Sequence, residues 1–213
     1  MDLDRILHEK KNFAELGDAD LEEFLRERRF GTEYLNLEFK SGFPRIENQK
    51  FDIRKIFKYI VGFSNEEGGL VIYGVADSIK EPSASFPTYI AGFDRHPSLE
   101  DLSQWAKDRI HPLIDSPSIR FFTVIGKKLA VLKVPSGANK PYCYLDPKTK
   151  SLTYFKKTSG GIEELMPDQV SAFYRAQMIK QANDILRASK ISAAIHEEEA
   201  PLPGGARALM QRP

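Results

Sequence analysis

Alternating apolar and polar residues mark the clearest strand in the chain, before residue 41. Leu35, Leu37 and Phe39 are separated by polar residues, among them Glu38 and Lys40. A strand turns successive side chains to opposite faces, so this pattern predicts one buried face and one polar face. Glu38 and Lys40 are expected to share the polar face. A Ser-Gly-Phe-Pro run at 41–44 ends the strand.

Other stretches show the longer period of amphipathic helices or the turn signals of hairpins. Residues 1 to about 30 begin the chain with helical spacing, and Asp18 is an N-cap candidate ahead of Leu21 and Leu25. Further helices are predicted over 51–63, 99–110 and 167 to about 195. Strands are predicted over 70–75, 119–125, 129–134, 142–144 and 152–156.

This order predicts an α+β protein with a compact mixed or antiparallel sheet and flanking helices. We expect an N-terminal helical segment over 1–30, a main domain over 31–175, a helical extension over 176–196 and a flexible tail over 197–213. The tail is rich in Glu, Pro and Gly and has little to bury.

Composition narrows the classes of protein. The 213 residues are 41% hydrophobic and 29% charged, which is typical of a globular protein, and no apolar run approaches a membrane span. A single cysteine, Cys143, excludes an intrachain disulfide and a cysteine-built metal site. With Asp2 and Asp4 following Met1 and no apolar leader, a cytoplasmic location is expected.

Charge is nearly balanced, at a formal net +1, but unevenly distributed. Acidic residues are concentrated before residue 40. Basic residues are concentrated later, where Lys148, Lys150, Lys156 and Lys157 lie within ten residues that contain no acid. A near-neutral protein can still bind a polyanion through one basic face.

Two linked motifs carry a family resemblance. Leu-Glu-Phe-Lys at 37–40 precedes Phe-Ser-Asn-Glu-Glu-Gly-Gly-Leu-Val-Ile-Tyr-Gly-Val-Ala-Asp at 63–77. Both resemble the Schlafen AlbA-like domain, and shorter matches at 110–112, 134–137, 140–142 and 154–160 extend the likeness over roughly residues 20 to 175. Two positions depart from the family pattern: Lys156 stands where Arg is frequent, and Glu66 stands where Thr is usual.

The resemblance implies an activity. Members of this family include endoribonucleases that cleave structured RNA such as tRNA with three carboxylates and a divalent metal. Glu33, Glu38 and Asp77 occupy the corresponding positions. The expectation is therefore an endonuclease using Mg²⁺ or Mn²⁺, with these acids as catalytic and metal-binding residues and Lys40 neutralising the substrate phosphate, in a defence or stress system.

The chemistry of the acids is consistent with this expectation, because hard divalent cations prefer oxygen ligands shared among carboxylates, water and phosphate. The plain alternative is that Glu38 is a solvated residue forming a weak surface pair with Lys40. Both readings stay open at the level of sequence.

Candidate nucleic-acid contacts lie later in the chain. Lysines, hydroxyls and glycines near a strand end suit phosphate, although a solvated hairpin tip would look the same. In contrast, Asn65 and the glycine pair at 68–69 favour a structural turn. A phosphate-binding Gly-x-x-x-x-Gly-Lys-Ser/Thr loop is absent, so ATP is not expected. The predicted binding residues are Lys148, Lys150, Lys156, Lys157, Thr158 and Ser159.

Three functions remain: the endonuclease, a non-catalytic DNA- or RNA-binding module or regulator, and a scaffold subunit of a larger complex. Nucleic acid, RNA before DNA, is the expected partner, with no membrane association. The last helix carries apolar positions, including Phe173, Met178 and Leu186, beyond what a small sheet needs. Such a stripe can supply a dimer seam, so a homodimer or a larger assembly is expected.

Overall fold

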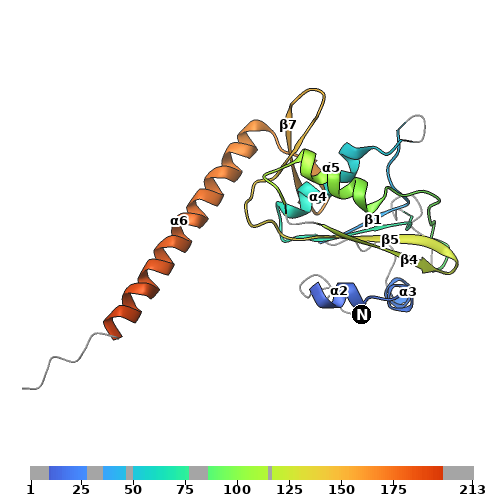
Figure 1. Ribbon diagram of the computed structural model, residues 1–213, viewed down its shortest axis with the longest axis horizontal. Helices are drawn as coiled ribbons and strands as arrows, with labels where there is room; N and C mark the ends of the chain where they lie inside the picture. The colour runs from blue at the N-terminus through green and yellow to red at the C-terminus, as the bar shows by residue number, and fades with distance from the viewer. Residues whose placement is uncertain (1–9, 28–35, 47–49, 77–85, 115–116, 199–213) are drawn as a thin grey trace, which may run out of the picture. The chain divides into compact units, whose positions relative to one another are not determined.

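Two four-stranded sheets form the framework of the residues that the structure, a computed structural model, describes: 10–27, 36–46, 50–76, 86–114 and 117–198 (Figure 1). The first sheet has the strand order β1-β2-β5-β4, and the second has the order β3-β6-β7-β8. β1 and β2 are parallel, and the other pairs are antiparallel. The strands are β1 (Leu37–Lys40), β2 (Gly69–Tyr73), β3 (Ile110–His111), β4 (Ser118–Val124), β5 (Lys127–Val134), β6 (Cys143–Leu145), β7 (Leu152–Thr158) and β8 (Gly161–Glu164).

The α+β class is confirmed, but the single compact sheet expected from the pattern is divided in two. The β4–β5 hairpin forms as predicted, with positive φ at Ile125 (47°) and Gly126 (75°) in its turn. β3 and β8 were not expected. A two-residue strand before Pro112 and a four-residue strand after Gly161 are too short to show a period.

Helix α4 (Ile53–Ser64) contacts strands of both sheets. Asp52 caps its N-terminus by accepting a hydrogen bond from the Lys55 N–H at 3.1 Å. Its apolar stripe, which includes Phe57 and Ile60, packs in one core with Val71 and Tyr73 of β2 and Phe155 of β7. Helix α5 (Leu99–Arg109) adds Ala106 to the same core.

The opposite face of the first sheet is covered by the helices α2 (Lys10–Glu15) and α3 (Asp18–Glu27). Phe13, Leu21 and Leu25 pack there against Leu37 and Phe39 of β1. Arg120 on β4 donates to the carbonyl oxygens of Phe13 and Ala14, which satisfies the carbonyl groups at the end of α2.

The turn after α4 joins the two sheets. The buried Asn65 amide donates to the carbonyl oxygens of Tyr142 (2.9 Å) and Phe155 (2.8 Å) and accepts from the Tyr142 N–H (2.7 Å). Gly68 has φ +81°, and a Cβ there would lie 2.7 Å from the Val134 oxygen. The Asn-Glu-Glu-Gly-Gly run is therefore a structural joint, as the sequence indicates.

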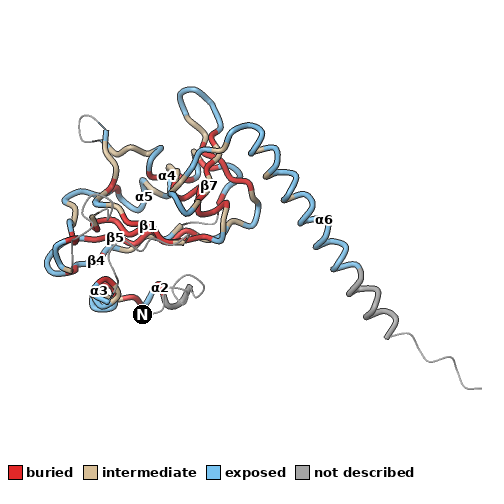
Figure 2. Tube along the Cα trace, turned by 180° about the vertical axis from the view of Figure 1, so that it is seen from behind, coloured by how far each residue is buried: buried red, intermediate tan, exposed pale blue. Residues whose placement is uncertain are grey.

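The chain divides into two compact units, Met1–Val170 and Ser171–Pro213. Helix α6 (Pro167–Glu198) begins in the first unit and makes up the described part of the second. From Ser171 to Ser189 its described side chains are exposed or half-buried (Figure 2). The tail from 199 lies outside the described residues. Within the described part of the chain, every helix is too short or too polar to span a bilayer.

Candidate functional site

Glu38 lies on the edge strand of the first sheet, yet it is only 4% exposed. Its register partner is Val71, so it lies on the face opposite Leu37 and Phe39, as the alternation predicts. That face is not solvated, because it carries the core around α4 and β7. The residue is therefore a buried carboxylate rather than a surface one.

Two lysines neutralise this carboxylate. Lys40 Nζ lies 2.6 Å from Glu38 Oε1, and Lys157 Nζ lies 2.8 Å from Glu38 Oε2. The Lys157 side chain, from β7, is 1% exposed, whereas that of Lys40 is 26% exposed. Charged groups are rarely buried this deeply unless they are paired. Glu38 therefore links β1 of the first sheet to β7 of the second.

A third lysine adds positive charge at the same place. The Lys58 ammonium lies 5.2 Å from the Tyr59 ring centre, and that of Lys40 lies 5.6 Å from it. Burial, followed by repulsion from Lys40, lowers the pKa of Lys58, while Glu38 acts in the opposite direction. Two ammonium groups thus pair directly with the Glu38 carboxylate, and that of Lys58 lies close enough to interact with it electrostatically.

Tyr73 completes the cluster. Its hydroxyl is fully buried and has no hydrogen-bond partner among the described residues. Burial raises the pKa of Tyr73, and Tyr59 and Glu38 raise it further. We refer to Glu38, Lys40, Lys58, Tyr59, Tyr73 and Lys157 as the Glu38 cluster.

The three predicted metal-binding acids are only partly in view, because Glu33 and Asp77 lie outside the described residues. Nowhere in the described ranges do three His, Cys, Asp or Glu residues gather closely enough to hold a metal ion. Glu38 is the one described member, and both of its oxygens are engaged by ammonium groups. A divalent cation at Glu38 would have to displace these lysines, and the three-acid metal site stays a prediction because Glu33 and Asp77 are not among the described residues.

The predicted nucleic-acid residues do not form one patch. Lys148 and Lys150 lie in the turn before β7, where the Asp146 carboxylate accepts from the Lys148 and Thr149 N–H groups. Hydrogen bonds from Thr149, then Lys148, lower the pKa of Asp146. Thr158 and Ser159 lie at the other end of β7, roughly 20 Å along a seven-residue strand.

Lys156 and Lys157 are neighbours in sequence but point to opposite faces of β7. Lys156 is part-exposed, and its ammonium lies 3.3 Å from Glu66. Lys157 is buried against Glu38, so it does not present its charge to solvent, which corrects the expected surface position. The alternation of Thr153, Phe155 and Lys157 along β7 is the signal that assigns Lys157 to the buried face.

Sequence reasoning also missed Lys58 and Tyr73. In the sequence, Lys58 occupies an ordinary polar position of an amphipathic helix, and Tyr73 belongs to a predicted buried strand. The parallel pairing of β1 with β2, which sets Lys40 beside Tyr73, brings Tyr73 near Glu38, and the packing of α4 on the same core brings Lys58 there.

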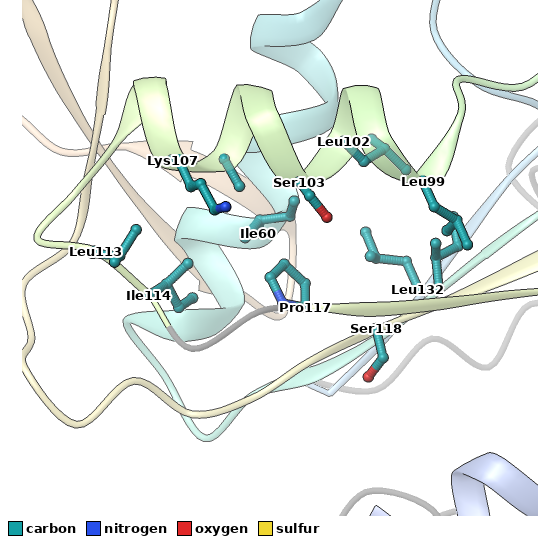
Figure 3. A pocket seen from close by; sticks show the side chains of 12 residues that line it. Ile60, Leu99, Leu102, Ser103, Lys107, Leu113, Ile114, Pro117, Ser118 and Leu132 are labelled. Atoms are coloured by element: carbon teal, nitrogen blue, oxygen red, sulfur yellow. The ribbon is translucent and has the colours of Figure 1, made fainter.

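A separate pocket of about 310 Å³ lies between α5, α4 and the first sheet (Figure 3). Its lining is mainly aliphatic, including Ile60, Leu102 and Leu132, with Ser103 and Lys107 among the polar residues. None of the residues predicted from the sequence to act on nucleic acid lines it.

Two solved structures are similar: the DIP2311 protein of Corynebacterium diphtheriae (16% identity, TM-score 0.43, 78% of this chain) and the N-terminal domain of a putative ATP-dependent DNA helicase RecG-related protein of Nitrosomonas europaea (20% identity, TM-score 0.40, 68% of this chain). This chain covers 29% of the first structure and 90% of the second. No curated protein matches the chain.

The sequence profile described as Schlafen, AlbA_2 matches residues 33–166, which is more than half of the 213 residues. The match spans every strand of both sheets and ends just before α6, and it includes every member of the Glu38 cluster. It supports a nucleic-acid-related role for the domain. The chain belongs to the Schlafen AlbA_2 family.

Proposed function

We propose that this domain binds the phosphate backbone of nucleic acid at the Glu38 cluster. The observation that carries the proposal is the excess of positive charge there: Lys40 and Lys157 pair with the one carboxylate of Glu38, and the Lys58 ammonium interacts electrostatically with both Glu38 and Lys40. Phosphate contacts by lysine supply most of the sequence-independent affinity for nucleic acids. RNA is the preferred ligand class, in line with the family resemblance.

The lysines have different roles in this proposal. Lys157 is buried and holds Glu38 in place. It does not contact the ligand in this proposal; it positions Glu38, which in turn positions Lys40. Lys40 and Lys58 lie nearer to solvent and are the proposed phosphate contacts. The lowered pKa of Lys58 supports this role, because a phosphate beside it would relieve the repulsion from Lys40.

The first prediction concerns Lys58→Gln, measured by fluorescence anisotropy with labelled tRNA, single-stranded RNA and duplex DNA over a range of salt concentrations. Removing one phosphate contact should lower the slope of log affinity against log salt by about one. We expect several-fold weaker binding at low salt for whichever ligand the wild-type protein binds.

Lys107→Gln is the matched control. It removes the same charge from an exposed position on α5, a helix that contributes no residue to the Glu38 cluster. It should leave the slope unchanged. Equal effects of the two substitutions, or no effect of either, would show that the cluster is not the binding site.

The metal-dependent endoribonuclease is the second candidate. It is favoured by the retention of acids at all three positions that the resemblance singles out, Glu33, Glu38 and Asp77, followed by Lys40. The test is incubation of tRNA with the protein and Mg²⁺ or Mn²⁺, comparing wild type with Asp77→Asn. Cleavage that Asp77→Asn abolishes would support this candidate. If the protein binds tRNA but does not cleave it, the endoribonuclease candidate is rejected and nucleic-acid binding is the only function of the two that is supported.

A further inference from the structure

Helix α6 carries a short apolar pattern that repeats after seven residues. Met178, Ile179 and Ala182 recur as Ile185, Leu186 and Ser189. Seven residues are close to two turns of an α-helix, so both groups lie on one side of the helix. The small residues Ala182 and Ser189 lie along the middle of this stripe, and the large ones lie on its two sides.

This stripe is exposed along the described part of the second unit (Figure 2). Met178, Ile179, Ile185 and Leu186 are 67%, 63%, 69% and 57% exposed. Tyr174, one turn before Met178, adds a further exposed aromatic side chain. Single exposed apolar residues are ordinary, but a contiguous row on one helix side marks an interaction surface.

An apolar stripe that stays exposed adds little to the stability of a helix, since most helical stability in proteins comes from burying an apolar face. α6 is 32 residues long, and the side chains of its second-unit part are exposed or half-buried over all positions described. The stripe therefore needs a partner of similar length and of the same apolar chemistry.

We propose that this partner is α6 of a second copy of the chain, which forms a two-helix seam centred on Ala182 and Ser189. The repeat makes the stripe self-complementary, as a two-fold interface requires: small residues in the middle permit close approach, and the flanking side chains pack around them. The proposal rests on α6 alone and does not depend on the nucleic-acid function.

The length of the stripe limits the area that the seam can bury. From Tyr174 to Ser189 the stripe is about 24 Å long. Pairing two such stripes buries on the order of 1,000 Å² in total, which is near the lower limit for a specific interface. We therefore expect a reversible dimer that dissociates in the micromolar range.

The test is sedimentation equilibrium of the full chain between about 1 and 100 µM, a range that brackets the expected dissociation constant. Wild type should pass from monomer to dimer over this range. The double substitution Met178→Glu with Ile185→Glu sets four like charges in the seam and should keep the protein monomeric. A wild-type protein that stays monomeric at the highest concentration would overturn the proposal.

The matched control is Ala176→Glu with Asn183→Glu, which has the same seven-residue spacing and adds the same charge outside the stripe. It should dimerise as wild type does. A dimer that survives the Met178 and Ile185 substitutions, or one that both double variants abolish, would contradict the seam. Leu186→Ala offers a milder variant, for which we expect a several-fold weaker dimer with unchanged helical circular dichroism.

Discussion

Glu38 and Lys157 hold opposite charges in a part of the protein that water scarcely reaches. Removing water from a charge is unfavourable, and the attraction between the partners compensates only while both are present. Loss of one partner leaves the other buried and uncompensated. If Lys157 is lost, Glu38 still has Lys40 as an ion-pair partner. If Glu38 is lost, Lys157 has no second carboxylate among its described ion-pair partners.

A double-mutant cycle on this pair is the prediction at the residue scale. Glu38→Leu alone should lower the free energy of unfolding by about 3 kcal/mol, because it strands the Lys157 charge. Adding Lys157→Met should restore part of the loss, since two apolar side chains of similar size fill the same space. Urea unfolding monitored by circular dichroism measures the free energy of unfolding of the single and the double variant.

The exposed pair of Arg54 and Glu164 is the control for this cycle. Its atoms are 2.9 Å apart, close to the 2.8 Å of the buried pair, but both side chains are more than half exposed. Its coupling energy should be below about 1 kcal/mol. If the two couplings were equal, burial would not be what makes the Glu38 pair important.

At the scale of secondary-structure elements, Asn65 fixes the C-terminal end of α4 against the second sheet. Its amide satisfies two carbonyl groups and one N–H group, all on chain segments of the second sheet or next to it. Because β7 carries Lys157, this joint also sets the position of Lys157 relative to Glu38 on β1.

Asn65→Ala should therefore lower the free energy of unfolding by about 3 kcal/mol or more, since it leaves three buried backbone groups without partners. Asn65→Asp should also destabilise, because a carboxylate cannot donate to the Tyr142 and Phe155 carbonyl oxygens. Asn139→Ala, at an exposed position nearby, should change stability little. Thermal unfolding compares the three. A mild effect of Asn65→Ala would argue against the joint.

The sequence pattern predicted individual helices and strands better than it predicted how they pack against one another. The alternation around Glu38 placed it on the face opposite Leu37 and Phe39, and Gly68, with its positive φ, follows the predicted turn, whereas Gly69 is already the first residue of β2. What covers that face depends on α4 and β7, which lie far from β1 in sequence. Burial of Glu38 is a property of that packing, so local periodicity did not reveal it.

At the scale of the whole molecule, the formal net charge is +1, so long-range attraction to a polyanion is weak. Binding must then depend on local charge. The basic residues chosen from sequence are dispersed over the two ends and two faces of β7, whereas the Glu38 cluster concentrates three ammonium groups. The cluster is therefore the centre of the proposed nucleic-acid site.

The same cluster predicts a pH dependence. The pKa of Lys58 is lowered in the free protein, and a bound phosphate should raise it. The contribution of Lys58 to affinity is then full below its free-state pKa and is lost as pH rises through its bound-state pKa. This loss should begin below the pH at which an ordinary lysine, of pKa 10.5, titrates.

The most direct measurement is an NMR titration of the lysine side chains, with and without a saturating RNA oligonucleotide. We predict that the pKa of Lys58 is lowered in the free protein and rises when RNA binds. An RNA that binds and leaves the Lys58 titration unchanged would contradict the assignment of the Glu38 cluster as the nucleic-acid site.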